Sequence, residues 1–299
     1  MNDKLKFIPK TEEEWHRHDL ELIESYRPMD DDFARELFRN NLPLAQRVIE
    51  IITGISGLEL QYTETQYDLN RLLGSRSICL DVFGVDKNGN LYNFEIQRSN
   101  AGASAKRARY HSSALDIEFF ESGEDFSKLP ISYVIFITEK DVIGDGKLIY
   151  RVERIIEGLN KPFNDDSHII FVNGAYNNPD DTSDLAKLVH DFKCTKADEM
   201  YIEELADSTK RFKETPKGVS EMCEKIENMR KIAMAQGREE GRAEGEAKGR
   251  AEGKAEGRFE GIFEAIIALV KDGLISVSEG AKRTNMSVTE FEAKLAAMN

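Results

Sequence analysis

The feature that most constrains the fold is the stretch of residues 77–97. Two short, strand-like runs, residues 78–85 and 91–97, lie on either side of a connection that contains Asn88-Gly89. An Asn-Gly pair between two such runs predicts a β-hairpin, because glycine readily adopts the left-handed backbone conformation that these turns need. We therefore expect the rest of the chain to be organised around this hairpin.

Two turns are compatible with the connection, and they give different registers. A two-residue Asn88-Gly89 turn pairs Asp81 with Ile96, whereas a three-residue loop with a left-handed Gly89 pairs Asp81 with Glu95. The apolar side chains favour the three-residue loop, because a shift of one residue moves every side chain to the opposite face. In that register one face holds six apolar side chains: Ile78, Leu80, Val82, Tyr92, Phe94 and Ile96.

This register places two acids directly opposite each other, Asp81 and Glu95, with Gln97 beside them. Like charges in such positions destabilise a sheet unless another group compensates them. A divalent cation bound between the two carboxylates is one solution. The other is a hairpin whose polar face lies in water, with the two acids splayed apart.

The spacing Asp81-x(13)-Glu95-x-Gln97 is followed by a predicted helix that carries basic and aromatic residues: Lys106, Arg107, Arg109 and Tyr110. This combination resembles the PD-(D/E)XK nuclease superfamily. More specifically, it is similar to the branch of nuclease-family transposases, also called recombination-promoting nucleases, in which Glu-x-Gln takes the place of Glu-x-Lys. The resemblance extends over roughly residues 28–215.

The resemblance implies a fold, a reaction and a cofactor. The fold is a restriction-endonuclease-like mixed sheet flanked by helices, and the reaction is hydrolysis of DNA phosphodiester bonds, in recombination or mobile-element movement. Asp81, Glu95 and the main-chain carbonyl of Ile96 would hold Mg²⁺, with Mn²⁺ or Ca²⁺ as alternatives. Gln97 would be catalytic, but its neutral amide cannot supply the charge of the lysine that it replaces.

The net charge of −14 argues against general affinity for nucleic acid, so the distribution of charge matters more than its sum. Residues 97–115 contain no acid, which makes them the longest acid-free stretch of the chain. We expect the predicted helix, residues 101–120, to contact DNA through Lys106, Arg107, Arg109 and Tyr110. The alternative is that these side chains form an ordinary solvated face.

Helical spacing predicts one or two amphipathic helices over residues 33–52. The run that precedes them, Asp30-Asp31-Asp32-Phe33, resembles the Asp-x-x-Phe opening of the family, with Asp30 at the matching position. Acids also favour a helix amino terminus for electrostatic reasons alone, which explains the run without a function. Three acids are candidates for a further metal ligand, and the sequence does not decide between them: Glu50, Glu64 and Asp68.

The remaining pattern of the first 215 residues alternates strands and helices. Residues 131–138, 148–152 and 168–173 read as strands, and residues 185–192 read as a helix. Together with the hairpin, this succession predicts a mixed α/β sheet covered by helices. We expect residues 1–215 to form one nuclease-like domain.

The composition changes after that domain. In residues 216–262, glycines recur every fourth position from Gly237 to Gly261, among charged residues and alanine. Because each glycine costs roughly 1 kcal/mol in a helix, this segment is a marginal solvated helix or a flexible tether, through which the chain could form a homo-oligomer. Residues 263–299 predict a small helical module that resembles a helix-turn-helix, with Ser276 and Ser287 as helix caps. Its few basic residues leave a simple packing module as the alternative to DNA binding.

Three further considerations limit the possible functions and the location of the protein. The first ten residues lack the apolar core of a signal peptide and no run is long enough to span a membrane, so we expect a cytoplasmic protein. The three cysteines, at 79, 194 and 223, lack the spacing of a zinc site or a disulfide framework. The alternative to a nuclease is a non-catalytic DNA-binding or assembly protein that retains the nuclease fold.

Overall fold

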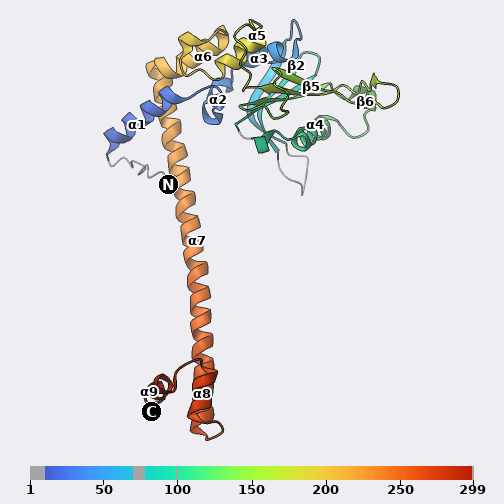
Figure 1. Cartoon of the computed structure of the whole chain (residues 1–299). Coiled ribbons are helices and arrows are strands. Elements are labelled where there is room, and N and C mark those ends of the chain that lie inside the picture. The colour runs from blue at the N-terminus through green and yellow to red at the C-terminus, as the bar shows by residue number, and fades with distance from the viewer. Residues whose placement is uncertain (1–10, 70–77, 99, 298–299) are drawn as a thin grey trace. The chain divides into compact units, whose positions relative to one another are not determined.

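The computed structural model describes residues 11–69, 78–98 and 100–297 (Figure 1); Ser77, the first residue of the predicted hairpin stretch, lies outside them. The chain divides into two compact units, residues 1–226 and 227–299. The long helix α7 (Pro216–Lys271) contributes its first turns to the first unit and the remainder to the second. Within the described ranges, no helix is long and apolar enough to cross a membrane.

The first unit is built on a mixed sheet whose strands lie in the order β1-β2-β3-β4-β8-β5. These strands are β1 (Leu60–Leu69), β2 (Ile78–Asp86), β3 (Leu91–Gln97), β4 (Ser132–Thr138), β5 (Ile149–Val152) and β8 (Ser167–Asn173). Strands β3, β4 and β8 are parallel to one another, and the other neighbours pair antiparallel. A separate two-stranded ribbon joins β6 (Ile155–Ile156) to β7 (Lys161–Pro162).

Helices cover both faces of this sheet (Figure 1). They are α1 (Glu12–Ser25), α2 (Asp31–Phe38), α3 (Leu42–Thr53), α4 (Ala105–Phe119), α5 (Asp184–Asp191) and α6 (Glu203–Glu214). One core cluster packs all of these except α4, together with the start of α7, against one face. A second cluster packs α4 against the other face. The predicted fold class, a mixed α/β sheet flanked by helices, is confirmed.

The register predicted for the hairpin is also confirmed. Val82 pairs with Phe94 and Val85 with Leu91, which is the register of the three-residue loop. Gly89 has a φ of 83°, and its N–H donates to the carbonyl of Asp86 at 3.0 Å. Glycine is favoured here because a side chain at positive φ would strain the turn.

One part of the hairpin prediction is wrong. The six apolar residues expected on one face are divided between the two core clusters: Val82, Tyr92, Phe94 and Ile96 lie in the first, whereas Ile78 and Leu80 lie in the second with Phe83. Leu80 and Phe83 are three residues apart, so they could share a face only if β2 departs from regular alternation between them. That departure occurs at Asp81.

The helices predicted from the sequence are found in the structure, and polar side chains cap several of them. Thr11 caps α1 by accepting a hydrogen bond from the N–H of Glu14. Helix α4 begins after Ser104, whose hydroxyl accepts from the N–H of Arg107, and it buries Ala108, Ser112 and Leu115. Ala105, at the start of the helix, is exposed.

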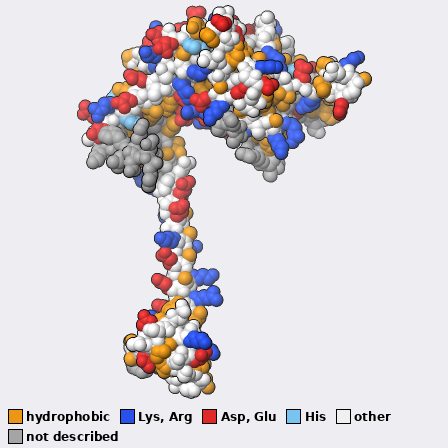
Figure 2. All heavy atoms as spheres, viewed as in Figure 1, with side chains coloured by type: hydrophobic (Ala, Val, Ile, Leu, Met, Phe, Trp, Pro, Cys, Tyr) orange, Lys and Arg blue, Asp and Glu red, His pale blue; other side chains and the backbone are white. Residues whose placement is uncertain are grey.

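The second unit contains the glycine repeat and the C-terminal module. Helix α7 is continuous through the repeat, and an added Cβ at any glycine from Gly237 to Gly261 would meet nothing within 4 Å. Charged side chains of both signs alternate along it (Figure 2). Helices α8 (Val277–Arg283) and α9 (Val288–Ala297) pack with the end of α7 around Phe291. Ser287 and Glu290 cap each other reciprocally, as a capping box requires.

Candidate functional site

Strands β2 and β3 separate at Asp81. Their regular pairing runs from Val85 and Leu91 to Val82 and Phe94. Beyond it, side chains take over the hydrogen bonding: the N–H of Ile96 donates to Oδ2 of Asp81 at 3.2 Å, and the N–H of Asp81 donates to Oε1 of Glu95 at 3.4 Å. In a strand the N–H and C=O of one residue point to the same side, so the carbonyl of Ile96 also faces the opening that Asp81 fills.

The neighbouring strand β1 is distorted at the same level. Thr65 pairs with Val82 and Tyr67 with Leu80, which leaves Gln66 and Asp81 between these two pairs. Gln66 has a φ of 60°, a conformation that is uncommon for a residue other than glycine, especially inside a strand. Strained backbone of this kind persists only where the surroundings impose it, and it gathers at functional sites. The distortion at Asp81 therefore passes through two adjacent strands.

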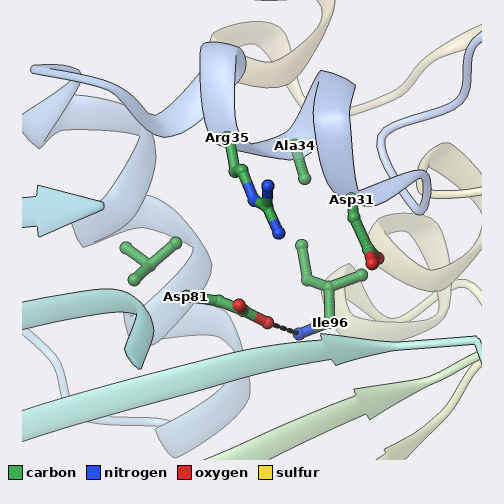
Figure 3. Close-up of a pocket in the computed structure, with 6 residues that line it drawn as sticks. Asp31, Ala34, Arg35, Asp81 and Ile96 are labelled. Atoms are coloured by element: carbon green, nitrogen blue, oxygen red, sulfur yellow. Dashed lines mark hydrogen bonds between the residues drawn. The ribbon is translucent and has the colours of Figure 1, made fainter. Parts of the chain in front are cut away.

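A small cavity opens beside Asp81 on the face covered by α2 (Figure 3). Its volume is about 10 Å³, room for roughly one water-sized sphere. The lining residues are Asp31, Ala34, Arg35, Asp81, Val82 and Ile96. Asp31 and Arg35 project into it from consecutive turns of α2, so α2 brings a second acid and a cation to the hairpin.

Two acids, Asp31 and Asp81, line this cavity with one cation, Arg35, so negative charge predominates. Burial, and after it the nearby carboxylates of Glu95 and Asp31, together raise the pKa of Asp81 to about 7. The hydrogen bond from Ile96 and the charge of Arg35 act in the opposite direction but do not offset these effects. Burial also raises the pKa of Asp31. Carboxylate and carbonyl oxygens gathered in this way fit a divalent cation, whose charge would stabilise their ionised forms.

Glu95 does not line this cavity: its fully buried side chain lies on the opposite face of the sheet and meets Asp81 through the hydrogen bond from the Asp81 N–H. Its Oε1 accepts from the amide of Asn93 at 3.1 Å and lies 3.5 Å from Nδ1 of His111. Its Oε2 accepts from Nη2 of Arg107 at 3.2 Å. Asn93 precedes Glu95 by two residues on β3, and Arg107 and His111 are four residues apart on α4, so each pair shares a face of its element.

The hydrogen bonds assign the tautomer of His111. Nε of Arg107 always carries a proton and donates to Nε2 of His111 at 3.3 Å. Nε2 is therefore the accepting nitrogen, and in the neutral ring the proton lies on Nδ1, which faces Oε1 of Glu95 at 3.5 Å and Nδ2 of Asn93 at 3.4 Å. Arg107 thus contacts both Glu95 and the histidine that lies against Glu95.

The structure places the other predicted site residues around this centre. Gln97 is partly buried, and its side chain lies against Gly102, where an added Cβ would come within 1.8 Å of Oε1 of Gln97. Lys106, Arg109 and Tyr110 are exposed on α4. Arg107, the fourth residue predicted to contact DNA, contacts Glu95.

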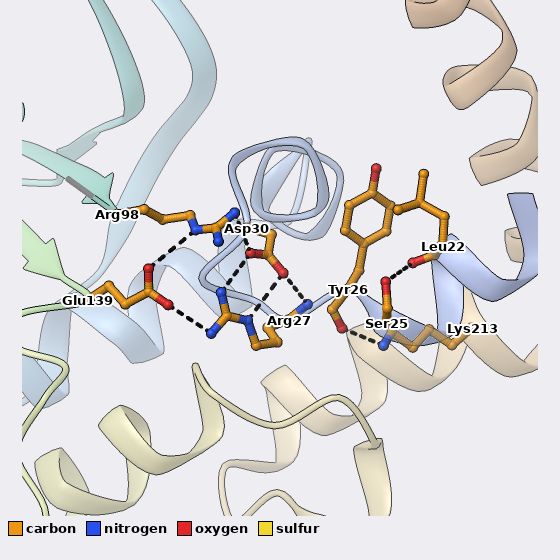
Figure 4. Close-up of polar contacts among 8 residues, drawn as sticks. All are labelled: Leu22, Ser25, Tyr26, Arg27, Asp30, Arg98, Glu139 and Lys213. Atoms are coloured by element: carbon orange, nitrogen blue, oxygen red, sulfur yellow. Dashed lines mark hydrogen bonds and ion pairs between the residues drawn. The ribbon is translucent and has the colours of Figure 1, made fainter. Parts of the chain in front are cut away.

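Asp30 lies next to the site but is engaged in a closed ring of ion pairs (Figure 4). Arg27 contacts Asp30 and Glu139, both at 2.9 Å, and Arg98 contacts the same two acids at 3.1 and 3.3 Å. Burial would raise the pKa of Asp30, but hydrogen bonds from Arg27 lower it. The ring fastens the start of α2 to the ends of β3 and β4, and so fixes the position of Asp31.

The acids left open as further ligands do not line the cavity beside Asp81. Glu64 lines a different cavity of about 320 Å³ with Arg35 and Lys225. Asp68 is paired with Cys79 across β1 and β2. The acid that lines this cavity together with Asp81 is Asp31, which the sequence did not single out. Its neighbour Asp30 was the only signal that could have indicated it.

Another cluster of potential ligands, His190, Asp191 and Cys194, has a structural explanation. Oδ2 of Asp191 accepts from the N–H groups of Tyr201 and Ile202 at 2.8 and 2.7 Å, at the start of α6. Burial raises the pKa of the Cys194 thiol to about 11, so the thiolate that binds metals is disfavoured. These residues therefore do not fit a metal site.

Comparison with known proteins gives one result. A family model described as PD-(D/E)XK nuclease family transposase matches residues 53–251, which include β1, β2, β3 and α4. No curated protein and no solved structure matches the chain. The matched segment contains Asp81, Glu95, Gln97 and Arg107, whereas Asp31 lies before it.

Proposed function

Since the chain belongs to the PD-(D/E)XK nuclease family transposases, we propose that it is a metal-dependent DNA endonuclease that hydrolyses phosphodiester bonds. The observation that carries this proposal is the opening between β2 and β3. There the fully buried Glu95 and the partly buried Asp81 replace the regular pairing, and they are linked by the 3.4 Å hydrogen bond from the N–H of Asp81 to Glu95. A hairpin that merely exposed its polar face to water would not bury Glu95 completely.

The proposed metal ligands are the carboxylates of Asp81 and Glu95 and the carbonyl of Ile96, with Asp31 as a further acid. These are the oxygen ligands that Mg²⁺ prefers, and Mn²⁺ or Ca²⁺ are the alternatives. When bound, the cation would polarise the phosphate and lower the pKa of an attacking water. The protein contributes the fixed positions of these oxygens, set by the hydrogen bonds at Asp81 and by the ion-pair ring at Asp30.

Gln97 and two arginines would act on the substrate beside these acids. The amide of Gln97 can orient a water molecule or donate to a phosphate oxygen, but it carries no charge. Positive charge near the site comes instead from Arg107, beside Glu95, and Arg35, beside Asp81. Guanidinium groups match phosphate geometry, so these side chains are suited to stabilise the charge of the scissile group.

DNA would approach over α4. Lys106, Arg109 and Tyr110 are exposed there, in the acid-free stretch of the chain. The proposed role is cleavage in recombination or mobile-element movement, with residues 1–215 as the catalytic domain. The glycine-repeat helix and the helical module of residues 263–299 would serve assembly into a homo-oligomer or delivery to a partner.

The alternative is a non-catalytic DNA-binding or assembly protein that retains the fold. Two observations favour it: Gln97 stands where the superfamily has lysine, and Glu95 is already paired with Arg107. A calorimetric titration with Mg²⁺ or Ca²⁺ separates the two functions. We expect the wild-type protein to bind the ion and Asp81→Ala to lose binding while retaining its far-ultraviolet circular dichroism; a wild-type protein without affinity would favour the alternative.

A further inference from the structure

The two carboxylate oxygens of Glu95 have partners of different kinds. Oε1 faces groups that are fixed in the core: the amide of Asn93, the ring of His111 and the N–H of Asp81. Oε2 faces the guanidinium of Arg107 at 3.2 Å. One oxygen is therefore anchored by groups fixed in the core, and the other is held by the guanidinium of an arginine.

The partners also differ in their freedom to move. Asn93 is 0% exposed and His111 is 3% exposed, so neither can leave without disturbing the core. The side chain of Arg107 is 38% exposed, and its long stem can carry the guanidinium into water at little cost. The interaction at Oε2 can be exchanged, whereas the interactions at Oε1 cannot.

We infer that Arg107 is an exchangeable counter-ion of Glu95, whose place at Oε2 a divalent cation takes, and that Asn93 and His111 are positioning residues that hold Oε1. This inference rests on the proposed metal site. A buried carboxylate needs a positive partner, and Arg107 supplies one until a cation binds. A bound cation then repels the guanidinium, because two positive groups cannot share one oxygen at low cost.

The exchange gives Arg107 a second position. Released from Oε2, its guanidinium remains beside the site on the half-exposed edge of α4, where it can pair with a phosphate oxygen of DNA. Arg107 would then contribute to DNA affinity only when the metal is bound. His111 would stay in place through its contact with Oε1 and so keep Glu95 oriented as a ligand.

We expect substitutions of Arg107 and His111 to change the affinity for metal in opposite directions. Arg107→Met keeps the apolar stem and removes the competitor for Oε2, so the affinity for Mn²⁺ in the absence of DNA should rise by about tenfold. His111→Leu removes a donor to Oε1, so the affinity should fall by about tenfold to a hundredfold. Lys106→Met, which alters the exposed preceding residue of the same helix, should leave metal affinity unchanged.

The experiment is a calorimetric titration of the full-length variants with Mn²⁺, with thermal unfolding of each variant as a check on folding. His111→Gln keeps a hydrogen-bond donor and should recover part of the affinity lost in His111→Leu. A fall in affinity for Arg107→Met, as large as that for His111→Leu, would show that Arg107 is a fixed positioning residue and would overturn the exchange. A wild-type protein that binds no Mn²⁺ would instead refute the proposed metal site, and this inference with it.

A second readout concerns DNA. The affinity for a short duplex is measured by fluorescence anisotropy, once in EDTA and once in Ca²⁺. Arg107→Met should weaken binding by about fivefold to tenfold in Ca²⁺ and leave it unchanged in EDTA, because Arg107 is tied to Glu95 without metal. An equal loss under both conditions would contradict the exchange, since it would place Arg107 on the phosphate at all times.

Discussion

The main-chain N–H of Ile96 donates a hydrogen bond to the carboxylate of Asp81 at 3.2 Å, where an antiparallel neighbour would ordinarily accept from the main chain. This contact makes a side chain part of the sheet. It turns the Asp81 carboxylate toward α2, and the side chains of β2 change faces of the sheet at this residue. It also leaves the carbonyl of Ile96 facing the opening between the strands. The candidate site is thus a consequence of how the hairpin is built.

Asp31 and Asp30 should respond differently to the same substitution. Asp31→Asn removes an acid from the cavity beside Asp81, so Mg²⁺ affinity should fall by about tenfold with little change in stability. Asp30→Asn breaks the ring of ion pairs and should lower the free energy of unfolding by about 1–3 kcal/mol. Calorimetry and urea denaturation of both variants make the comparison. An equal loss of metal affinity in both would show that the ring, and not the carboxylate of Asp31, determines binding.

The stability of the metal-free protein should depend on pH through Asp81. Its pKa is about 7 in the folded protein, above the value near 4 of an unfolded chain, so the folded state binds the proton more tightly. This contribution to the free energy of unfolding is fully present below pH 4 and is lost as the pH rises to about 7. Asp81→Asn removes it, so relative to wild type the variant should gain on the order of 3 kcal/mol between pH 4 and pH 8.

Urea denaturation in EDTA at several pH values measures this difference. Asp31→Asn provides a comparison, because it alters the same cavity without removing Asp81. Parallel pH profiles for wild type and Asp81→Asn would mean that Asp81 ionises as it does in water, and the cavity would not concentrate negative charge.

The register and the core strands could be predicted from the sequence because they depend on local rules. The left-handed Gly89 fixes the loop, and the loop fixes which residues of β2 and β3 face each other. The register brings Asp81 level with Glu95, but the strands separate there and the two carboxylates lie on opposite faces of the sheet instead of facing each other. The helices that cover the sheet were likewise indicated by the spacing of their apolar residues.

The composition of the site could be predicted only in part, because it depends on tertiary packing. Nothing in the sequence shows that a side chain will replace a main-chain partner at Asp81, so the change of face in β2 was missed. Asp31 could not be distinguished from Asp30 before the position of α2 was known. From the sequence, Arg107 could equally have pointed into water or contacted Glu95. His111, which follows four residues later on the same face of the helix and is buried, offered a signal for the contact.

Gly102 should control the position of Gln97. A Cβ at residue 102 would lie 1.8 Å from Oε1 of Gln97, so Gly102→Ala must displace that side chain. We expect the cleavage rate to fall by about tenfold to a hundredfold with metal affinity unchanged, because the reacting groups are misplaced and the ligands are not. A cycle with Gln97→Ala tests the cause: the double variant should be no slower than Gln97→Ala alone. If the losses in cleavage rate are additive, Gly102 does not act through the position of Gln97.

Two truncations should separate the core from the tail. The first turns of α7 bury Met222 and Ile226 in the main core, at 1% and 6% exposure. A fragment of residues 1–226 should therefore fold and bind metal, whereas residues 1–215 should lose about 3–6 kcal/mol of stability with those two side chains. Light scattering should show a lower oligomeric order for the 1–226 fragment than for the full chain. Equal stability of the two fragments would place the domain boundary at 215.

The most direct test of the account is the nicking of a supercoiled plasmid as a function of Mg²⁺ concentration, with wild type, Asp81→Ala and Glu95→Ala compared at equal protein concentration. We expect wild-type nicking to require Mg²⁺ and to saturate with it, and we expect both variants to be inactive although folded. Nicking by either variant at the wild-type rate, or wild-type nicking that persists in EDTA, would contradict the claim that the two acids of the hairpin hold the metal for phosphodiester hydrolysis.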